Sequence, residues 1–301
     1  MLPGKLTTSI KGHRVTGDPA SHPYAGKTAA LATKHDKLGL IGPPLERAVG
    51  LQVEAVAVDT DSLGTFTGDI ARRGTPLETA IAKARLGMSA TGQTLGIASE
   101  GSIGPDPTMP LVITDRELVV LVDDDRRTVV SGSYTSSDIV TATAAVAPGN
   151  DLDALLTAAD FPTHQLIARP NAGSIHPIRK GIANVEDLTA SVSECAQASS
   201  DGFACIETDL RAHACPSRQA IITAAAERLA QRLAALCPSC GSPGWGVVDV
   251  LFGIPCAWCG SEVRRPRAEV DGCEACKHQE IRSVVALEAR ADPAECQICN
   301  P

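Results

Sequence analysis

The sequence predicts an α/β protein in which a mixed sheet flanked by helices is followed by a C-terminal zinc-ribbon domain. Residues 26–148 and residues 150–236 both alternate short apolar runs with amphipathic helical patterns, which is typical of strands packed against helices. The last quarter of the chain carries four Cys-x-x-Cys pairs, the spacing of zinc knuckles. With 301 residues and a hydrophobic content of 44%, the chain is long enough to bury a core.

We expect four segments along the chain. The polar residues 1–24 form a flexible N-terminal extension, and residues 25–148 form the first α/β domain. Residues 149–236 form a second α/β segment packed on the first, and residues 237–301 form a double zinc ribbon. These boundaries follow changes in hydrophobic periodicity and the start of the cysteine pairs.

Strands and helices alternate in the first domain. Thr75, Pro76 and Glu78 make a capping box, in which Thr75 caps a helix and Glu78 reaches back from its third position. The acidic and basic cluster within ELVVLVDDDRRTVVSGSY marks the turn of a hairpin. The other elements are a strand in KTAALATKH, a helix in PPLERAVG with Pro44 in its first turn, a strand in LQVEAVAV and a strand in QTLGIAS.

The second segment continues this α/β pattern. Asn184 caps a helix that runs through Ala198, and Pro216 begins a long helix that ends next to Cys237. The remaining elements are a helix in DLDALLTAAD and strands in HQLIARP and GFACIETDL.

Eight cysteines are the ligands that we expect for two structural zinc ions. The gaps between successive pairs are 15, 13 and 19 residues. Joining the first pair with the second and the third with the fourth is the simpler arrangement, and interleaved joining is the alternative. Four thiolates leave no open coordination position, so this zinc is expected to clamp the fold rather than to catalyse. The pairs are Cys237/Cys240, Cys256/Cys259, Cys273/Cys276 and Cys296/Cys299.

Charge and hydropathy argue against several classes of protein. The net charge of −8 disfavours a nucleic-acid footprint, and the last 65 residues carry six basic against nine acidic side chains. No apolar run reaches the roughly 20 residues that cross a bilayer, and the N-terminus has no hydrophobic signal core. We therefore expect a cytoplasmic protein with reduced cysteines and no membrane contact, and these patterns leave a homo-oligomer open.

Three motifs of the first domain carry a resemblance to a known superfamily. ATKHDK follows a strand and contains Lys37, TPLETAIAKAR contains Lys83, and Ser99-Glu100-Gly101 comes thirteen residues after Arg85. In order and spacing these motifs resemble those of the inosine triphosphate pyrophosphatase superfamily, which acts on non-canonical purine nucleotides and shows T-F-x-E-N-A-x-x-K-A-R and D-D-S-G. The resemblance implies a pyrophosphatase-like fold for about residues 28–125.

The resemblance also implies a metal-dependent hydrolase of a nucleoside triphosphate or a related phosphorylated small molecule. Glu100, in what reads as a glycine-bounded turn, would hold the metal or take a proton from water, while Lys37 and Lys83 would neutralise phosphate charge. Mg²⁺ would be the catalytic metal. The superfamily's acidic pair is replaced here by Ala71-Arg72-Arg73, so Asp69 is the candidate magnesium ligand, with Asp59 and Asp61 as the alternative. We expect the substrate also to contact Thr33, His35, Arg72, Arg211 and His213.

The segment ETDLRAH supplies the last two of these substrate contacts. It ends a strand just before the helix that begins at Pro216, a place where α/β proteins commonly bind anions. If this strand pairs with HQLIARP, His164 and Arg169 join the same group. Arg218 opposes the dipole of its helix, which predicts that it binds a partner. A network of ion pairs that ties the layers together explains the segment equally well.

The whole chain also resembles an uncharacterised bacterial family. That family is marked by ATKH, DTD-x-x-GTFTG, ASEGS-x-GP, ETD-x-RAH and the same cysteine pairs. This second resemblance supports a two-part architecture and supplies no activity. The alternative function is therefore a non-catalytic zinc-ribbon protein that binds a protein or nucleic-acid partner.

Overall fold

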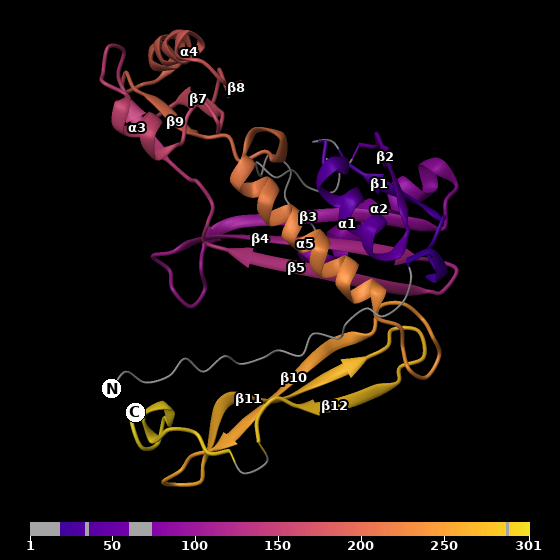
Figure 1. Ribbon diagram of the computed structural model, residues 1–301. Coiled ribbons are helices and arrows are strands. Elements are labelled where there is room, and N and C mark those ends of the chain that lie inside the picture. Colours follow the sequence, from indigo (N-terminus) through magenta and orange to yellow (C-terminus); the bar gives the residue numbers. More distant parts are fainter. Residues whose placement is uncertain (1–18, 34–35, 60–73, 287–288) are drawn as a thin grey trace, which may run out of the picture. The chain divides into compact units, whose positions relative to one another are not determined.

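The computed structural model forms two compact units (Figure 1). The described residues are 19–33, 36–59, 74–286 and 289–301. Unit 1 includes residues 19–25, 48–50 and 231–301, and unit 2 comprises residues 26–47 and 51–230. The expected boundary between residues 148 and 149 therefore lies inside a single unit.

Unit 2 contains a five-stranded mixed sheet. Its strands are β1 (Thr28–Ala32), β2 (Gln52–Val56), β3 (Leu95–Pro105), β4 (Ile113–Asp123) and β5 (Thr128–Ser136). They lie in the order β2-β1-β3-β4-β5, with β1 parallel to β2 and β3 and with β4 antiparallel to β3 and β5. The predicted mixed sheet is confirmed, and the predicted hairpin is the β4–β5 pair.

Helix α2 (Pro76–Thr91) covers one face of this sheet. Its predicted capping box is present, because the Glu78 N–H donates to Thr75 Oγ1 and the Glu78 carboxylate accepts the Thr75 N–H at 2.8 Å. The buried side of α2 packs on β3 and β4 through an apolar cluster of Ala80, Ala84, Met88, Ala98, Val120 and Val122.

Helix α1 (Leu38–Val49) begins earlier than the predicted start near Pro44. The N–H of Ile41 donates to the Lys37 carbonyl at 3.0 Å, so the first helical turn forms directly after Lys37. Pro43 and Pro44 consequently lie inside the helix rather than in its first turn.

Helix α5 (Pro216–Ala234) begins as predicted and packs on the opposite face of the mixed sheet. Gly132 of β5 is a point of close approach, because a Cβ added there would lie 2.1 Å from the backbone nitrogen of Leu229. Gly132 pairs with Val119 of β4, and directly paired residues point to the same face. Odd-numbered residues of β4 therefore face α5, and even-numbered residues face α2.

The described helices are amphipathic rather than apolar throughout. α5 has 19 residues and carries Arg218, Glu227, Arg228 and Arg232 along its length. None of the helices in the described ranges combines the length and the apolar character that a membrane span needs.

Unit 2 also contains a four-stranded antiparallel sheet in the second half of its sequence. Its strands are β6 (Thr143–Val146), β7 (Leu166–Pro170), β8 (Arg179–Ile182) and β9 (Ala204–Thr208), in the order β6-β9-β7-β8. The accompanying helices are α3 (Asp153–Ala158), α4 (Val185–Ala198) and the 3₁₀ helix η3 (Ala212–Ala214). The predicted cap of α4 is confirmed, since the Asp187 N–H donates to the Asn184 side chain at 2.8 Å.

Unit 1 is built around a three-stranded antiparallel sheet. The strands β10 (Gly246–Pro255), β11 (Glu262–Gly272) and β12 (Gln279–Ser283) follow one another in space as they do in the sequence. Two short 3₁₀ helices, η1 (Pro19–Ser21) and η4 (Pro293–Glu295), complete its regular elements in the described residues.

The N-terminal residues of unit 1 pack against the end of α5. Tyr24 is fully buried, and its N–H donates to Nδ1 of His22. The other ring nitrogen of His22 donates to the Leu233 carbonyl at 3.0 Å. The prediction of a flexible extension over residues 1–24 is therefore wrong for residues 19–24, which are packed. Residues 1–18 lie outside the described residues.

Glu100 lies in the middle of a strand rather than at the expected turn. β3 continues to Pro105 and pairs with β4 along its whole length, which places Glu100 opposite Leu118. The predicted strand end at Ser99 is wrong because pairing with β4, a contact distant in sequence, overrides the local preference of the flanking glycine.

Candidate functional site

The eight predicted zinc ligands form two groups of four thiols in unit 1. Within each group all sulfur atoms lie within 4.8 Å of one another. The simpler joining of successive pairs is wrong, and the interleaved alternative is present. One four-cysteine group is Cys237, Cys240, Cys273 and Cys276, and the other is Cys256, Cys259, Cys296 and Cys299.

The distances between the sulfur atoms suit a tetrahedral metal ion. Sγ of Cys237 lies 3.7 Å from Sγ of Cys276, and Sγ of Cys256 lies 3.9 Å from Sγ of Cys299. A tetrahedral zinc ion with Zn–S bonds of about 2.3 Å separates its sulfurs by about 3.8 Å. A disulfide would need about 2.05 Å. Both four-cysteine groups could therefore hold structural metal ions such as zinc.

Serine hydrogen bonds favour the thiolate form of two outer cysteines. The hydroxyl and the backbone N–H of Ser242 lower the pKa of Cys240 to about 6. Ser261 lowers the pKa of Cys259 to about 6 in the same way. The thiolate is the form of cysteine that binds a metal, so these hydrogen bonds favour the metal-binding form of Cys240 and Cys259.

Antiparallel strands explain the interleaved arrangement. The Cys256/Cys259 knuckle lies in the turn between β10 and β11, and the Cys273/Cys276 knuckle lies in the turn between β11 and β12. Successive turns of an antiparallel sheet lie at opposite ends of the strands. A ten-residue strand such as β10 is roughly 30 Å long. Neighbouring knuckles therefore cannot share an ion, whereas alternate knuckles can.

The predicted catalytic residues Lys37, Lys83 and Glu100 lie together in unit 2. Lys83 on α2 forms an ion pair with Glu100 on β3. Lys37 follows the end of β1, and its Nζ donates to Ser99 Oγ at 2.8 Å. The side chains of Lys83 and Glu100 are 14% and 6% exposed, so this carboxylate is buried beside a cation rather than turned toward solvent.

A second charged pair lies on the side of the mixed sheet that faces α5. Arg218 Nε donates to Glu117 Oε1 at 2.7 Å, and Arg218 Nη1 donates to the Leu210 carbonyl at 2.6 Å. Asp115 precedes Glu117 by two residues on the same face of β4, and both side chains are fully or almost fully buried. When both carboxyls are ionised, neither oxygen of Asp115 has a hydrogen-bond partner among the described residues, and Glu117 Oε2 has none.

Burial shifts the pKa values of two groups in this charged cluster. Burial lowers the pKa of the Lys37 ammonium to about 8, and the carboxylate of Glu117 opposes part of that shift. Burial also raises the pKa of the Asp115 carboxyl to about 7, and the negative charge of Glu117 adds to the rise. Strongly shifted groups of opposite sign within one cluster are typical of functional sites, although ion-pair networks also produce them.

The other residues predicted for the first domain are only partly described. Thr33 follows β1, and its N–H donates to the Val56 carbonyl at 3.5 Å. His35, Arg72 and Asp69, the candidate magnesium ligand, lie outside the described residues.

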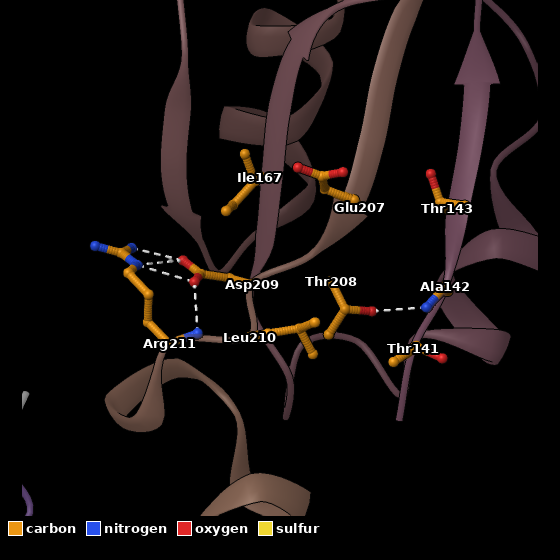
Figure 2. A pocket seen from close by; sticks show the side chains of 9 residues that line it. All are labelled: Thr141, Ala142, Thr143, Ile167, Glu207, Thr208, Asp209, Leu210 and Arg211. Carbon is orange, nitrogen blue, oxygen red and sulfur yellow. Dashed lines mark hydrogen bonds and ion pairs between the residues drawn. The ribbon is translucent and has the colours of Figure 1, made fainter. Parts of the chain in front are cut away.

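Arg211 lines a pocket of about 370 Å³ at the end of β9 (Figure 2). Its guanidinium is turned onto Asp209, with Nε at 2.9 Å from Oδ1, and Asp209 also accepts the Gly181 N–H at 3.1 Å. The carboxylate of Asp209 is thus used to hold Arg211. The pocket is also lined by Thr141, Ala142, Thr143, Ile167, Glu207, Thr208 and Leu210.

Of the two residues expected to join the ETDLRAH segment, His164 and Arg169, the pairing of β7 with β9 brings Arg169 to it. Arg169 Nε lies 3.5 Å from Glu207 Oε1, as the pairing of these strands predicts. His213 lies in η3, is exposed and does not line the pocket. The substrate contacts expected for Arg211 and His213 stay predictions.

Comparison with known proteins places the chain in a family. A family model described as a domain of unknown function, DUF6671, matches residues 83–301, which is more than two thirds of the chain. The chain belongs to the DUF6671 family. A comparison with curated proteins found no match, so the resemblance to the inosine triphosphate pyrophosphatase superfamily stays a prediction.

The DUF6671 region contains most of the charged cluster. Lys83, Glu100 and Arg218 lie inside it together with all eight knuckle cysteines, whereas Lys37 precedes it. The family match therefore includes both the two four-cysteine groups and the buried carboxylates of β4, and it assigns a role to neither.

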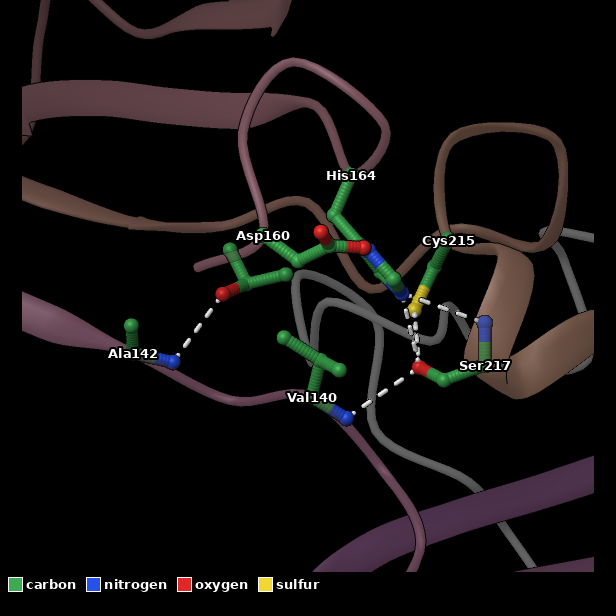
Figure 3. A network of polar contacts seen from close by, with 7 residues as sticks. Val140, Ala142, Asp160, His164, Cys215 and Ser217 are labelled. Carbon is green, nitrogen blue, oxygen red and sulfur yellow. Dashed lines mark hydrogen bonds and ion pairs between the residues drawn. The ribbon is translucent and has the colours of Figure 1, made fainter. Parts of the chain in front are cut away.

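His164 holds the beginning of α5 rather than joining the ETDLRAH segment (Figure 3). Its Nε2 accepts the N–H of Ser217 at 3.1 Å and lies 3.0 Å from Ser217 Oγ, while Nδ1 donates to Asp160 at 3.0 Å. The arrangement of Asp160, His164 and Ser217 resembles a catalytic triad. Because Nε2 is shared with a backbone N–H of the first helical turn and Asp160 is 59% exposed, the ring serves as a helix cap.

Asp115 and Glu117 are the site residues that sequence reasoning missed. They occupy alternate positions along β4. From the local sequence, this pattern predicts a strand face that is exposed to solvent. They are buried in the tertiary structure, where Arg218 of α5 lies against Glu117. No local signal marks this burial, although the unexplained arginine at position 218 indicates a partner somewhere on the facing layer.

Gly101 should be intolerant of a side chain because the Glu117–Arg218 pair fills the space above it. A Cβ at Gly101 would lie 2.2 Å from Glu117 Oε1 and 2.5 Å from Arg218 Nη2. We expect Gly101→Ala to lower the free energy of unfolding by about 1–3 kcal/mol, the usual cost of overpacking. Urea unfolding measures this loss. Gly104→Ala on the same strand is the control, since no atom lies within 4 Å there, and equal effects of the two variants would contradict the expectation.

Proposed function

We propose that this chain is a metal-dependent hydrolase of a nucleoside triphosphate or a related phosphorylated small molecule, with zinc used only to hold unit 1 together. The observation that carries the proposal is that Lys83 on α2 pairs with Glu100 on β3, while Lys37, which precedes α1, donates to the adjacent Ser99. A carboxylate paired with one lysine, together with a second lysine near the same strand, supplies what hydrolysis of a phosphoanhydride requires: neutralised phosphate charge and a proton acceptor.

The resemblance to inosine triphosphate pyrophosphatases implies a specific reaction. Water attacks the α phosphorus, the bond from that phosphorus to the bridging oxygen breaks, and pyrophosphate leaves with the bonding electrons. Glu100 accepts the proton of the attacking water. A divalent ion such as Mg²⁺ would supply further charge neutralisation on the phosphates. The parallel pairing of β1 with β3 supports the resemblance, because Leu31 lies opposite Ile97 and the chain therefore leaves β1 on the side of Ser99, to which Lys37 donates.

Because Glu100 is buried in an ion pair, a phosphate that binds here would have to break that pair before Glu100 could accept a proton. Lys83 neutralises Glu100 in this structure. A phosphate group that bridges Lys37 and Lys83 would draw Lys83 away from the carboxylate and leave Glu100 able to accept a proton. The ion pair between Lys83 and Glu100 is then the resting form of the site.

Release of pyrophosphate from a panel of nucleoside triphosphates, in the presence of Mg²⁺ or Mn²⁺, tests the proposal. We expect Glu100→Gln to lower kcat at least roughly 100-fold, the usual contribution of a positioned proton acceptor. Glu54→Gln, which changes an exposed glutamate on β2, is the matched control and should retain full activity. Thermal unfolding of both variants establishes that they are folded. Absence of pyrophosphate release from every nucleotide, or full activity of Glu100→Gln, would contradict the proposal.

A second candidate is a non-catalytic protein that binds a protein partner through unit 1. Three large apolar side chains of this unit favour it, since Trp258, Ile281 and Ile298 are 79%, 69% and 68% exposed. The acidic balance of the same region disfavours nucleic acid as the partner. Cross-linking in cell extract compares the wild-type chain with Trp258→Ser. Loss of one defined complex in the variant, together with no nucleotide hydrolysis by either chain, would favour this candidate.

A further inference from the structure

We propose that Asp115 and Glu117 on β4 bind a hard divalent cation, Mg²⁺ or Mn²⁺, through the carboxylate oxygens that lack hydrogen-bond partners within the described part of the chain. The cation would lie on the side of the mixed sheet that faces α5. The inference rests on the proposed function only for the use of the ion, because the ion itself can bind without a nucleotide.

The hydrogen bonds of the cluster leave one buried carboxyl without a donor among the described residues. Glu100 is paired with Lys83, and Glu117 Oε1 is held by Arg218. Lys37 donates to the hydroxyl of Ser99 at 2.8 Å. Asp115 is fully buried, and neither of its oxygens, when ionised, has a hydrogen-bond partner among the described residues. A buried carboxylate without hydrogen bonds is costly, so a protein that retains one normally supplies a proton or a metal.

The geometry of β4 places the open oxygens together. Asp115 and Glu117 are two residues apart on one strand face, where the Cα atoms are about 6.6 Å apart and two carboxylates can reach a common ion. Arg218 donates to Glu117 at Oε1, and Oε2 has no hydrogen-bond partner in the described ranges. The opposite position on β3 is Gly101, and its missing side chain leaves the space that this carboxylate occupies.

The chemistry of these donors selects the class of metal. Carboxylate oxygens suit Mg²⁺ and Mn²⁺, and Mg²⁺ is commonly held by one or two carboxylates with its other positions filled by water and substrate phosphates. Zinc prefers the thiolates of the four-cysteine groups. Asp115 and Glu117 would thus fill the role that the sequence prediction gave to Asp69, in a cluster that also contains Lys37.

Titration of the zinc-loaded protein with Mn²⁺, followed by the electron paramagnetic resonance signal of the free ion, tests the site without any nucleotide. We expect the wild-type chain to bind one Mn²⁺, which Mg²⁺ displaces, and Asp115→Asn to bind it at least tenfold more weakly. Asp124→Asn is the matched control, because it removes the same charge from an exposed position just beyond the other end of β4. It should bind Mn²⁺ as the wild type does.

Thermal unfolding separates loss of the ion from loss of the fold. Mn²⁺ should raise the Tm of the wild type and of Asp124→Asn but not that of Asp115→Asn, whose Tm without metal should equal or exceed that of the wild type. No Mn²⁺ binding by the wild type, or equal binding by Asp115→Asn, would overturn the site, and a proton would then be what neutralises Asp115. Mn²⁺ binding that depends on Asp115 supports the site even if no nucleotide is hydrolysed. Nucleotide hydrolysis by a chain that shows no such binding overturns the site and leaves the proposed function standing.

Discussion

A chain in which Cys240 and Cys276 are both replaced by serine should retain one zinc ion, whereas a chain in which Cys240 and Cys259 are replaced should retain none. Cys240 and Cys276 belong to the same four-cysteine group, so their loss leaves the other group complete. Cys240 and Cys259 belong to different groups, so their loss damages both. If successive pairs shared an ion instead, Cys240 and Cys259 would belong to one site. The Cys240/Cys259 variant would then retain one zinc ion.

Metal analysis of the purified chains by mass spectrometry measures these counts. The wild type should contain two zinc ions, and a double replacement of the buried cysteines Cys195 and Cys205, which lie outside both groups, should also contain two. One zinc ion in the Cys240/Cys259 variant would contradict the interleaved arrangement. Fewer than two ions in the reduced wild-type chain would contradict the assignment of zinc to both groups.

Loss of zinc should also unfold much of unit 1. The sheet of unit 1 has many exposed positions, and all five residues of β12 are exposed. Structural zinc in small domains contributes an apparent binding free energy of about 10–16 kcal/mol, which is larger than the free energy of unfolding of most domains. We therefore expect the sheet to depend on zinc ions bound by the cysteine groups at its two ends.

Replacing Arg218 by methionine should destabilise unit 2 by about 3–5 kcal/mol at neutral pH, the usual cost of removing one partner of a buried ion pair. Arg218 and Glu117 are 3% and 0% exposed, so Arg218→Met leaves the Glu117 carboxylate buried without its guanidinium. The Leu210 carbonyl also loses the donor that lies 2.6 Å from it. Urea unfolding at neutral pH measures the loss.

Two further variants separate the buried ion pair from a general effect of lost charge. Arg218→Met combined with Glu117→Gln should recover part of the stability, because the double variant no longer buries an uncompensated charge. Arg85→Met removes an arginine from an exposed pair with Asp124, in which the side chains are 52% and 44% exposed, and should cost at most about 1 kcal/mol. Equal losses in Arg218→Met and Arg85→Met would contradict a structural role for the buried pair.

Local features of this chain were predicted well from sequence. The capping box at Thr75 and the Asn184 cap depend on side chains three residues from the backbone groups they bind, and both are present. The β4–β5 hairpin likewise depends on a turn between adjacent segments. The eight knuckle cysteines were recognisable because two-residue spacing is itself the local geometry of a zinc knuckle.

Features that depend on register or on layer packing were not predicted. Glu100 reads as part of a turn, yet pairing with β4 extends the strand through it. The order of the cysteine pairs depends on which end of an antiparallel sheet each turn occupies, and spacing alone does not state this.

The sequence by itself therefore determined which side chains are available: eight thiols at knuckle spacing, a capped helix with Lys83, and an arginine at position 218 that opposes its helix dipole. Only the tertiary structure decided which of them meet. Arg218 and Glu117 are 101 positions apart, and they come together because α5 covers the face of β4 that carries Asp115 and Glu117. Burial turns those carboxylates from solvated surface groups into a charged cluster, since the cost of removing a charge from water exists only once another layer has closed over it.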